Sequence, residues 1–169
     1  MTTVEHTPTV EPPAPFTVPA VAHLGGDDLP WVTVDEGVEL KVLQVDLATG
    51  LWVIRNRFQP GVQIPTHRHT GDVYGVTLSG AWKYLEYDFV NRAGSWLFEP
   101  AGSVHTLSVL AENTEPTEAV FVIHGANLDV TADGDVTMVV DAALVLEVYL
   151  AQCEAEGHGR PAVIGMPTA

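Results

Sequence analysis

Short runs of apolar and β-branched residues, separated by turn-forming residues, fill the middle of this chain. Beginning at about residue 31, the clearest runs are 38–47, 51–58, 81–90, 95–102, 104–110, 118–127 and 128–140. Runs of this length and composition, bounded by glycine, proline and asparagine, are typical of β-strands. The last run contains Asp133-Gly134 between two apolar stretches, which predicts a β-hairpin.

One segment, residues 141–157, has the pattern of a helix instead. Asp141 is a suitable N-cap, and Gly157 is a suitable stop. The expected apolar stripe consists of Leu144, Val148 and Ala151. Many short strands followed by one helix predict an all-β fold, a barrel or a sandwich with a C-terminal helix laid against it.

The length of 169 residues suggests one domain, which we divide into three parts. Residues 1–30 form a Pro-rich N-terminal arm, residues 31–140 the barrel, and residues 141–169 the C-terminal helix and tail. The arm lacks the basic and apolar regions of a signal peptide. We expect it to be extended and able to pack on a partner subunit.

Composition excludes several function classes. The net charge is −15 with only 7 Lys+Arg, which argues against binding of nucleic acid or of anionic membranes. No apolar run approaches the roughly 20 residues needed to span a bilayer. Cys153 is the single cysteine, which fits a reducing compartment. Together with the absent signal peptide, this predicts a cytoplasmic protein.

Three histidines are candidate metal ligands. His67 and His69 are separated by one residue, so on a strand both imidazoles face the same side. Two neutral imidazoles on one face can converge on one metal ion. His105 follows a tight turn at Pro100 and Gly102. The alternative is a set of core histidines satisfied by hydrogen bonds.

The spacing of these residues resembles the two sequence motifs of the cupin family, the double-stranded β-helix or jelly-roll barrel. The matching residues are Gly61, His67, His69 and Gly80 in the first motif, and Gly94, Pro100, Gly102 and His105 in the second. One residue departs from the pattern, because Val73 stands where the family has a glutamate. Without that carboxylate a bound dication keeps its full charge, which favours an anionic enolate as ligand.

Residues 65–107 look like the 2,4′-dihydroxyacetophenone dioxygenases and, more distantly, the acetylacetone-cleaving dioxygenases. This resemblance implies a non-haem Fe(II) enzyme that uses O2 to cleave a carbon–carbon bond next to a carbonyl in an α-hydroxyketone or β-diketone. It implies His67, His69 and His105 as ligands. Imidazoles also suit Zn, Ni or Mn. The alternatives are therefore a redox-neutral metal-dependent isomerase, decarboxylase or hydrolase, and a non-catalytic metal- or ligand-binding cupin.

Two glutamates are candidate catalytic residues. Strand alternation after Gly80 places Glu86 on the face of Trp82 and Tyr84. If that face is inward, Glu86 is a fourth ligand, a base or a neighbour of the ligands; a register slip of one residue exposes it to solvent. Glu99 lies six residues before His105, where the resemblance implies a carboxylate that orients a ligand imidazole.

Aromatic residues are candidates for a substrate pocket. Tyr74, Trp82 and Tyr84 can line an apolar site for an aryl ketone, or they can belong to the barrel core. Cupins commonly pair through edge strands, so the resemblance also implies a homodimer or homotetramer.

Overall fold

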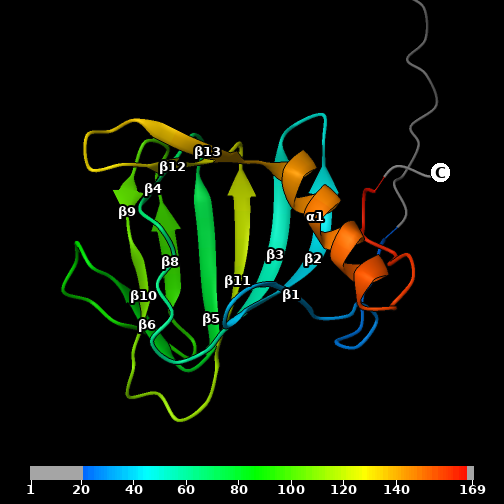
Figure 1. The fold of residues 1–169 in the computed structure, drawn as a ribbon, viewed down its shortest axis with the longest axis horizontal. Helices are drawn as coiled ribbons and strands as arrows, with labels where there is room; N and C mark the ends of the chain where they lie inside the picture. Colours follow the sequence, from blue (N-terminus) through cyan, green and yellow to red (C-terminus); the bar gives the residue numbers. More distant parts are fainter. Residues whose placement is uncertain (1–20, 167–169) are drawn as a thin grey trace, which may run out of the picture.

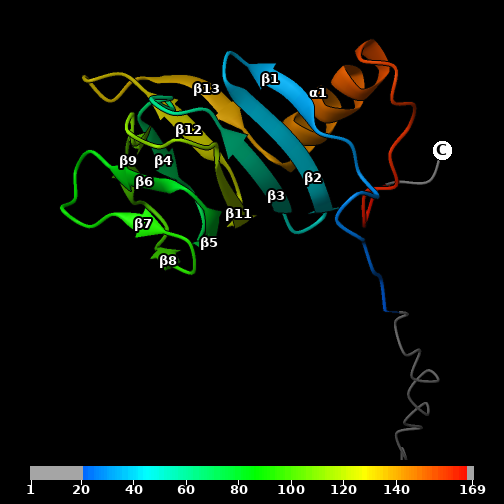
Figure 2. The ribbon, with the colours of Figure 1, turned by 90° about the horizontal axis from the view of Figure 1, so that it is seen from below.

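Three antiparallel sheets and one helix make up residues 21–166, the part of the chain that this computed structural model describes (Figure 1). The sequence-based prediction of an all-β fold with a C-terminal helix is confirmed. In Figure 2 the short strands β4, β6, β7 and β9 gather at one side of the molecule, and the helix lies at the opposite side.

The large sheet has six strands. In spatial order these are β1 (Val32–Asp35), β2 (Val38–Asp46), β3 (Leu51–Phe58), β11 (Thr117–His124), β5 (Val73–Ser79) and β8 (Trp96–Glu99). Burial alternates along β3 and β11, as expected for strands with one face toward a core. The inward positions of β3 are Trp52, Ile54, Asn56 and Phe58. Since three of these four are large and apolar, they fix which face of the strand is buried.

Two smaller sheets complete the barrel. One contains β13 (Val136–Val140), β12 (Asn127–Val130), β4 (His67–His69) and β9 (Val104–His105), in that order. The other contains β10 (Leu107–Val109), β6 (Ala81–Tyr84) and β7 (Asn91–Arg92). The turn between β12 and β13 holds Asp133-Gly134, which confirms the predicted hairpin.

Gly80 links β5 to β6 and needs to be glycine for two reasons. Its φ is +70°, a region that other residues seldom adopt. A Cβ atom here would also lie 2.8 Å from Cα of Thr117, whose side chain is fully buried. The first expected motif therefore ends in a turn that only glycine fits.

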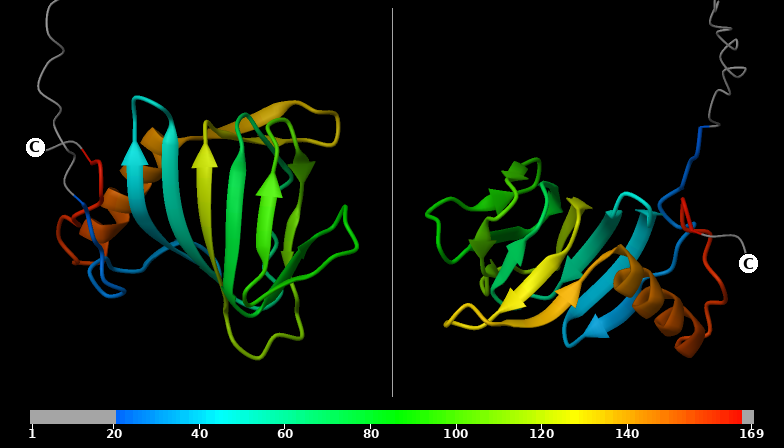
Figure 3. Two further views of the ribbon diagram at one scale, coloured as in Figure 1. Left: turned by 180° about the vertical axis from the view of Figure 1, so that it is seen from behind. Right: turned by 90° about the horizontal axis from the view of Figure 1, so that it is seen from above.

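The helix α1 (Ala142–Ala155) begins after Asp141, whose side chain accepts a hydrogen bond from the amide of Leu144 at 2.9 Å. The predicted cap is confirmed, but the predicted buried stripe is wrong. The buried residues are Ala142, Val145, Leu146, Tyr149 and Cys153. Apolar side chains surround most of this helix, so periodicity alone did not identify the face that packs on β1 and β2 (Figure 3).

Part of the predicted arm packs on the barrel. Leu29 is 2% exposed, and the buried ammonium of Lys41 donates a hydrogen bond to the carbonyl oxygen of Gly26. The hydroxyl of Tyr149 donates to the carbonyl of Pro30 at 2.8 Å. The rest of the predicted arm, residues 1–20, lies outside the described residues. Among residues 21–166, no helix has the length and apolar character needed to cross a membrane.

Candidate metal centre

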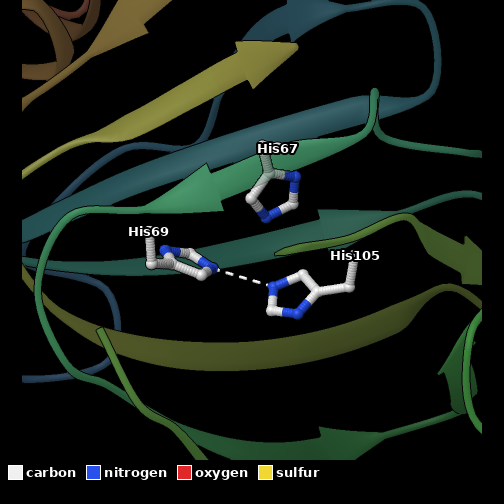
Figure 4. A group of neighbouring side chains, drawn as sticks. All are labelled: His67, His69 and His105. Carbon is white, nitrogen blue, oxygen red and sulfur yellow. Dashed lines mark hydrogen bonds between the residues drawn. The ribbon is translucent and has the colours of Figure 1, made fainter. Parts of the chain in front are cut away.

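Two neighbouring strands bring the three predicted histidines together. In the pairing of β4 with β9, His67 stands directly opposite His105. His69 shares the inward face of β4 with His67, because the two are separated by one residue. All three side chains are buried, and Figure 4 shows their rings turned toward one another.

The rings are close enough to bind one ion. One nitrogen from each of the three rings lies within 4.8 Å of the other two. The Nε2 atoms of His69 and His105 are 2.9 Å apart. Nδ1 of His67 donates to the carbonyl oxygen of Pro65 at 2.8 Å, which leaves its Nε2 lone pair free to face the other rings.

Burial keeps His67 neutral. Loss of solvent lowers the pKa of its imidazole to about 4, and the hydrogen bond to Pro65 opposes this only in part. A neutral imidazole is the form that binds metals, so the ring needs no deprotonation at neutral pH.

Glu99 lies inside this cluster and is 3% exposed. Its Oε2 atom is 2.7 Å from Nε2 of His69 and 3.1 Å from Nε2 of His105. Burial raises the pKa of this carboxyl, but the interactions with His105 and His69 outweigh it and bring the pKa to about 2. Glu99 therefore lies beside two of the three predicted ligand rings, where the resemblance implied a carboxylate that orients an imidazole.

Tyr84 holds the other oxygen of this carboxylate. Its hydroxyl donates to Oε1 of Glu99 at 2.5 Å, and its ring stacks on His105 with centroids 3.8 Å apart. Burial, followed by the nearby charge of Glu99, raises the pKa of the Tyr84 phenol. The phenol therefore stays protonated and remains a donor to the carboxylate.

Glu86 does not point into the barrel. Strand β6 ends at Tyr84, and the amide of Tyr87 donates to the Tyr84 carbonyl, so the chain turns before Glu86. Glu86 is exposed and accepts a hydrogen bond from the backbone amide of Thr106 at 2.9 Å. The expected inward register holds through Tyr84 but fails at Glu86, because strand alternation ends where the turn begins.

A cavity of about 360 Å³ adjoins the cluster and is lined mainly by apolar side chains. His67, His69, Glu99 and Tyr84 form part of its wall. Apolar residues from β13 and α1 also line it, namely Met138, Val140, Leu144, Val145 and Val148. Figure 3 shows the hairpin of β12 and β13 crossing the ends of the strands of the large sheet, with the helix beside β1 and β2.

The other two predicted pocket residues lie elsewhere. Tyr74 faces away from the interior, where its ring packs against Trp96 and Phe98. Trp82 is 1% exposed in the core, with its indole N–H donating to Thr77. Neither lines the cavity, so Tyr84 is the one of the three predicted residues that does.

The cavity wall also contains polar residues that the sequence motifs do not indicate. Asn56, Asn127 and Asp129 line it, and Oδ1 of Asn127 is buried without a hydrogen-bond partner. Asn56 was visible in principle: it is the one polar residue among the inward positions of 51–58. Asn127 and Asp129 face His69 and His67 across the β12–β4 pairing, which no sequence motif indicates.

Comparisons with known proteins agree with this architecture. The pattern of the ChrR Cupin-like domain family matches residues 20–128. A protein of unknown function with a cupin-like fold from Ralstonia eutropha JMP134 is 29% identical, with a TM-score of 0.73, covering 88% of this chain and 99% of its own. An RmlC-like cupin from the same organism is 26% identical, with a TM-score of 0.79, covering 87% and 96%.

A third structure shares the fold alone. It is an acetylacetone dioxygenase from Acinetobacter johnsonii, 16% identical, with a TM-score of 0.69 over 81% of this chain and 95% of its own. No curated protein matches the chain.

Proposed function

Since the chain belongs to the ChrR Cupin-like domain family, we propose that it is an Fe(II)-dependent dioxygenase that cleaves a carbon–carbon bond next to a carbonyl. The observation that carries this proposal is the convergence of three buried imidazoles, two of which, those of His67 and His69, line a largely apolar cavity. The substrate would be an α-hydroxyketone, such as a dihydroxyacetophenone, or a β-diketone. The sequence resemblance to such dioxygenases and the shared fold of an acetylacetone dioxygenase support it.

His67, His69 and His105 would hold the metal, because each can direct a ring nitrogen to a common point. Bound Fe(II) would act as a Lewis acid toward the substrate oxygens and would supply the redox chemistry with O2. Three imidazoles suit this ion and leave positions for other ligands.

The cavity would bind and orient the hydrocarbon part of the substrate. Its wall is mainly apolar, and β13 and α1 close it on one side with Met138, Leu144 and Val148. The unpaired Oδ1 atom of Asn127 would accept a hydrogen bond from a substrate hydroxyl. An aryl ketone with a hydroxyl group meets both requirements.

Neither predicted catalytic glutamate is placed to accept a substrate proton. Glu86 is exposed outside the cavity. Both oxygens of Glu99 already contact side chains, Oε1 the Tyr84 hydroxyl and Oε2 the rings of His69 and His105. In the overall reaction of an α-hydroxyketone, the bond breaks to give two carboxylic acids, and O2 supplies one oxygen atom to each, so no other reductant is consumed.

Oxygen uptake tests this proposal. Protein purified without air and loaded with Fe(II) would be offered a panel of α-hydroxyketones and β-diketones. Uptake should follow substrate concentration and fall at least about 100-fold in His105→Ala, since a ligand is lost. The matched control is His124→Ala, an exposed histidine at the end of β11 that should leave uptake unchanged.

A redox-neutral metal enzyme is the second candidate, because the same imidazoles suit Zn, Ni or Mn. Turnover of a ketone by Zn-loaded protein without O2 would favour it. Bound metal with no uptake and no turnover would contradict both enzymatic proposals and leave a binding protein.

A further inference from the structure

Val73 and Glu99 are partners across two paired strands. In the pairing of β5 with β8, Val73 stands directly opposite Glu99. Val73 is 1% exposed and Glu99 is 3% exposed, and both line the cavity beside the histidines. Side chains directly opposite on one face of an antiparallel pair have Cβ atoms about 5 Å apart. A carboxylate on either strand can therefore reach the same point.

The distances between the polar atoms are those of ligands that share an ion. Nε2 of His69, Nε2 of His105 and Oε2 of Glu99 form a triangle with sides of 2.9, 2.7 and 3.1 Å. Two donors at right angles, each about 2.1 Å from an ion, lie about 3 Å apart. Oε2 is buried and makes no other side-chain hydrogen bond, so its close polar contacts are these two ring nitrogens.

Tyr84 fixes which oxygen faces the rings. Its hydroxyl binds Oε1 of Glu99, and its ring stacks on His105, so the carboxylate and one imidazole are held by the same side chain. This leaves Oε2 as the oxygen that faces the Nε2 atoms of His69 and His105.

We propose that Glu99 is a direct ligand of the metal and supplies, from β8, the carboxylate that Val73 does not supply from β5, with Tyr84 as the positioning residue. The inference rests on the metal binding in the proposed function but not on its substrate or on O2. It also changes the electrostatics expected from the sequence, because a carboxylate ligand halves the net charge of a bound dication.

Metal affinity tests this ligand assignment without catalysis. Co(II) serves as the probe, with its affinity measured by competition against a chromophoric chelator and its coordination followed by visible absorption. Glu99→Val should weaken Co(II) binding at least about 100-fold and change the absorption spectrum, since the number of ligands falls. Circular dichroism of the metal-free protein checks that each variant folds.

The exchange of positions provides the sharper test. Val73→Glu combined with Glu99→Val should restore Co(II) affinity to within about 10-fold of the parent, because the two side chains reach one point. Val73→Glu alone should bring no gain, since two carboxylates would compete for that point. Such a non-additive pattern is the signature of direct competition.

Tyr84→Phe separates positioning from ligation. It retains the Glu99 carboxylate and removes only the hydrogen bond to Oε1, so Co(II) affinity should fall about 3- to 10-fold with little spectral change. The proposal is overturned if Glu99→Val leaves the Co(II) spectrum unchanged, or if Val73→Glu alone tightens binding. Either result would mean that Glu99 lies outside the ligand set.

Discussion

Glu118 on β11 belongs to a network of ion pairs that spans three strands on the outer face of the large sheet. Its carboxylate accepts hydrogen bonds from Arg55 and Arg57 on β3, and Arg57 also bonds Glu39 on β2 at 3.3 Å. Burial raises the pKa of Glu118, but the hydrogen bonds from the two arginines outweigh it and lower the pKa below its ordinary value. The ionised carboxylate therefore stabilises the folded state.

This pKa shift predicts an acid dependence of stability. A carboxyl whose folded pKa is lowered contributes stability above its unfolded pKa of about 4.5 and loses it as pH falls through the folded value. Glu118→Gln should lower the free energy of unfolding by about 1–2 kcal/mol at pH 7 and by less below pH 4. Urea unfolding across pH 3–7 measures this. Glu115→Gln, which removes the same charge at an exposed position, should change neither the free energy of unfolding nor its dependence on pH.

The individual site residues differ in how far sequence could predict them. His67, His69 and His105 follow from spacing, because a strand period of two places the first pair on one face. Spacing does not show which of the two glutamates, Glu86 or Glu99, lies beside the histidines. It depends on where β6 ends and on how β8 pairs with β5, and both are set by contacts distant in sequence.

At the scale of elements, β13 and α1 lie beyond the matched family region and still line the cavity. They contribute apolar side chains only, so we expect them to determine which substrates bind rather than how they react. Their contribution was not predictable from the helix pattern. Leu144 and Val148 were expected in one apolar stripe, but they border the cavity, while Leu146 and Tyr149 are buried away from it.

Neighbouring residues of β13 provide a matched test of this role. Met138 is 53% exposed and lines the cavity, whereas Val139 is 50% exposed and does not. Met138→Asp should raise KM for an apolar ketone about 5- to 30-fold, because burying about 50 Å² of apolar substrate surface there contributes about 1–2 kcal/mol. Val139→Asp should leave KM unchanged. Equal effects of both variants on KM in oxygen-uptake assays would contradict a role of β13 in substrate binding.

At the scale of the whole molecule, the outer face of β8 carries an aromatic surface. Trp96 and Phe98 are 67% and 50% exposed, and both pack against Tyr74 on β5. Strand β8 is also an edge of the six-stranded sheet. Exposed aromatic residues on an open sheet edge favour association. We propose that a second copy of the chain covers this edge, in accord with the homo-oligomer expected from the resemblance.

Light scattering coupled to size exclusion tests this association. The parent protein should have at least twice the mass of one chain, and Trp96→Asp should shift it toward the single-chain mass, because a charge on the edge opposes pairing. The control is Leu47→Asp, at a 45% exposed position in the turn after β2, and it should leave the measured mass unchanged. A parent protein of single-chain mass at micromolar concentration would refute the proposal.

The ligand cluster has one further consequence for the barrel. His67 and His69 come from β4 and His105 from β9, in one sheet, while Glu99 comes from β8, in another. An ion bound by all of these side chains would cross-link the two sheets. A cross-link of this kind lowers the conformational entropy of the unfolded chain more than that of the folded chain, and an ion that binds only the folded chain stabilises it. Metal occupancy would then determine the rates of thermal unfolding and of proteolysis of the sheet that carries His67, His69 and His105.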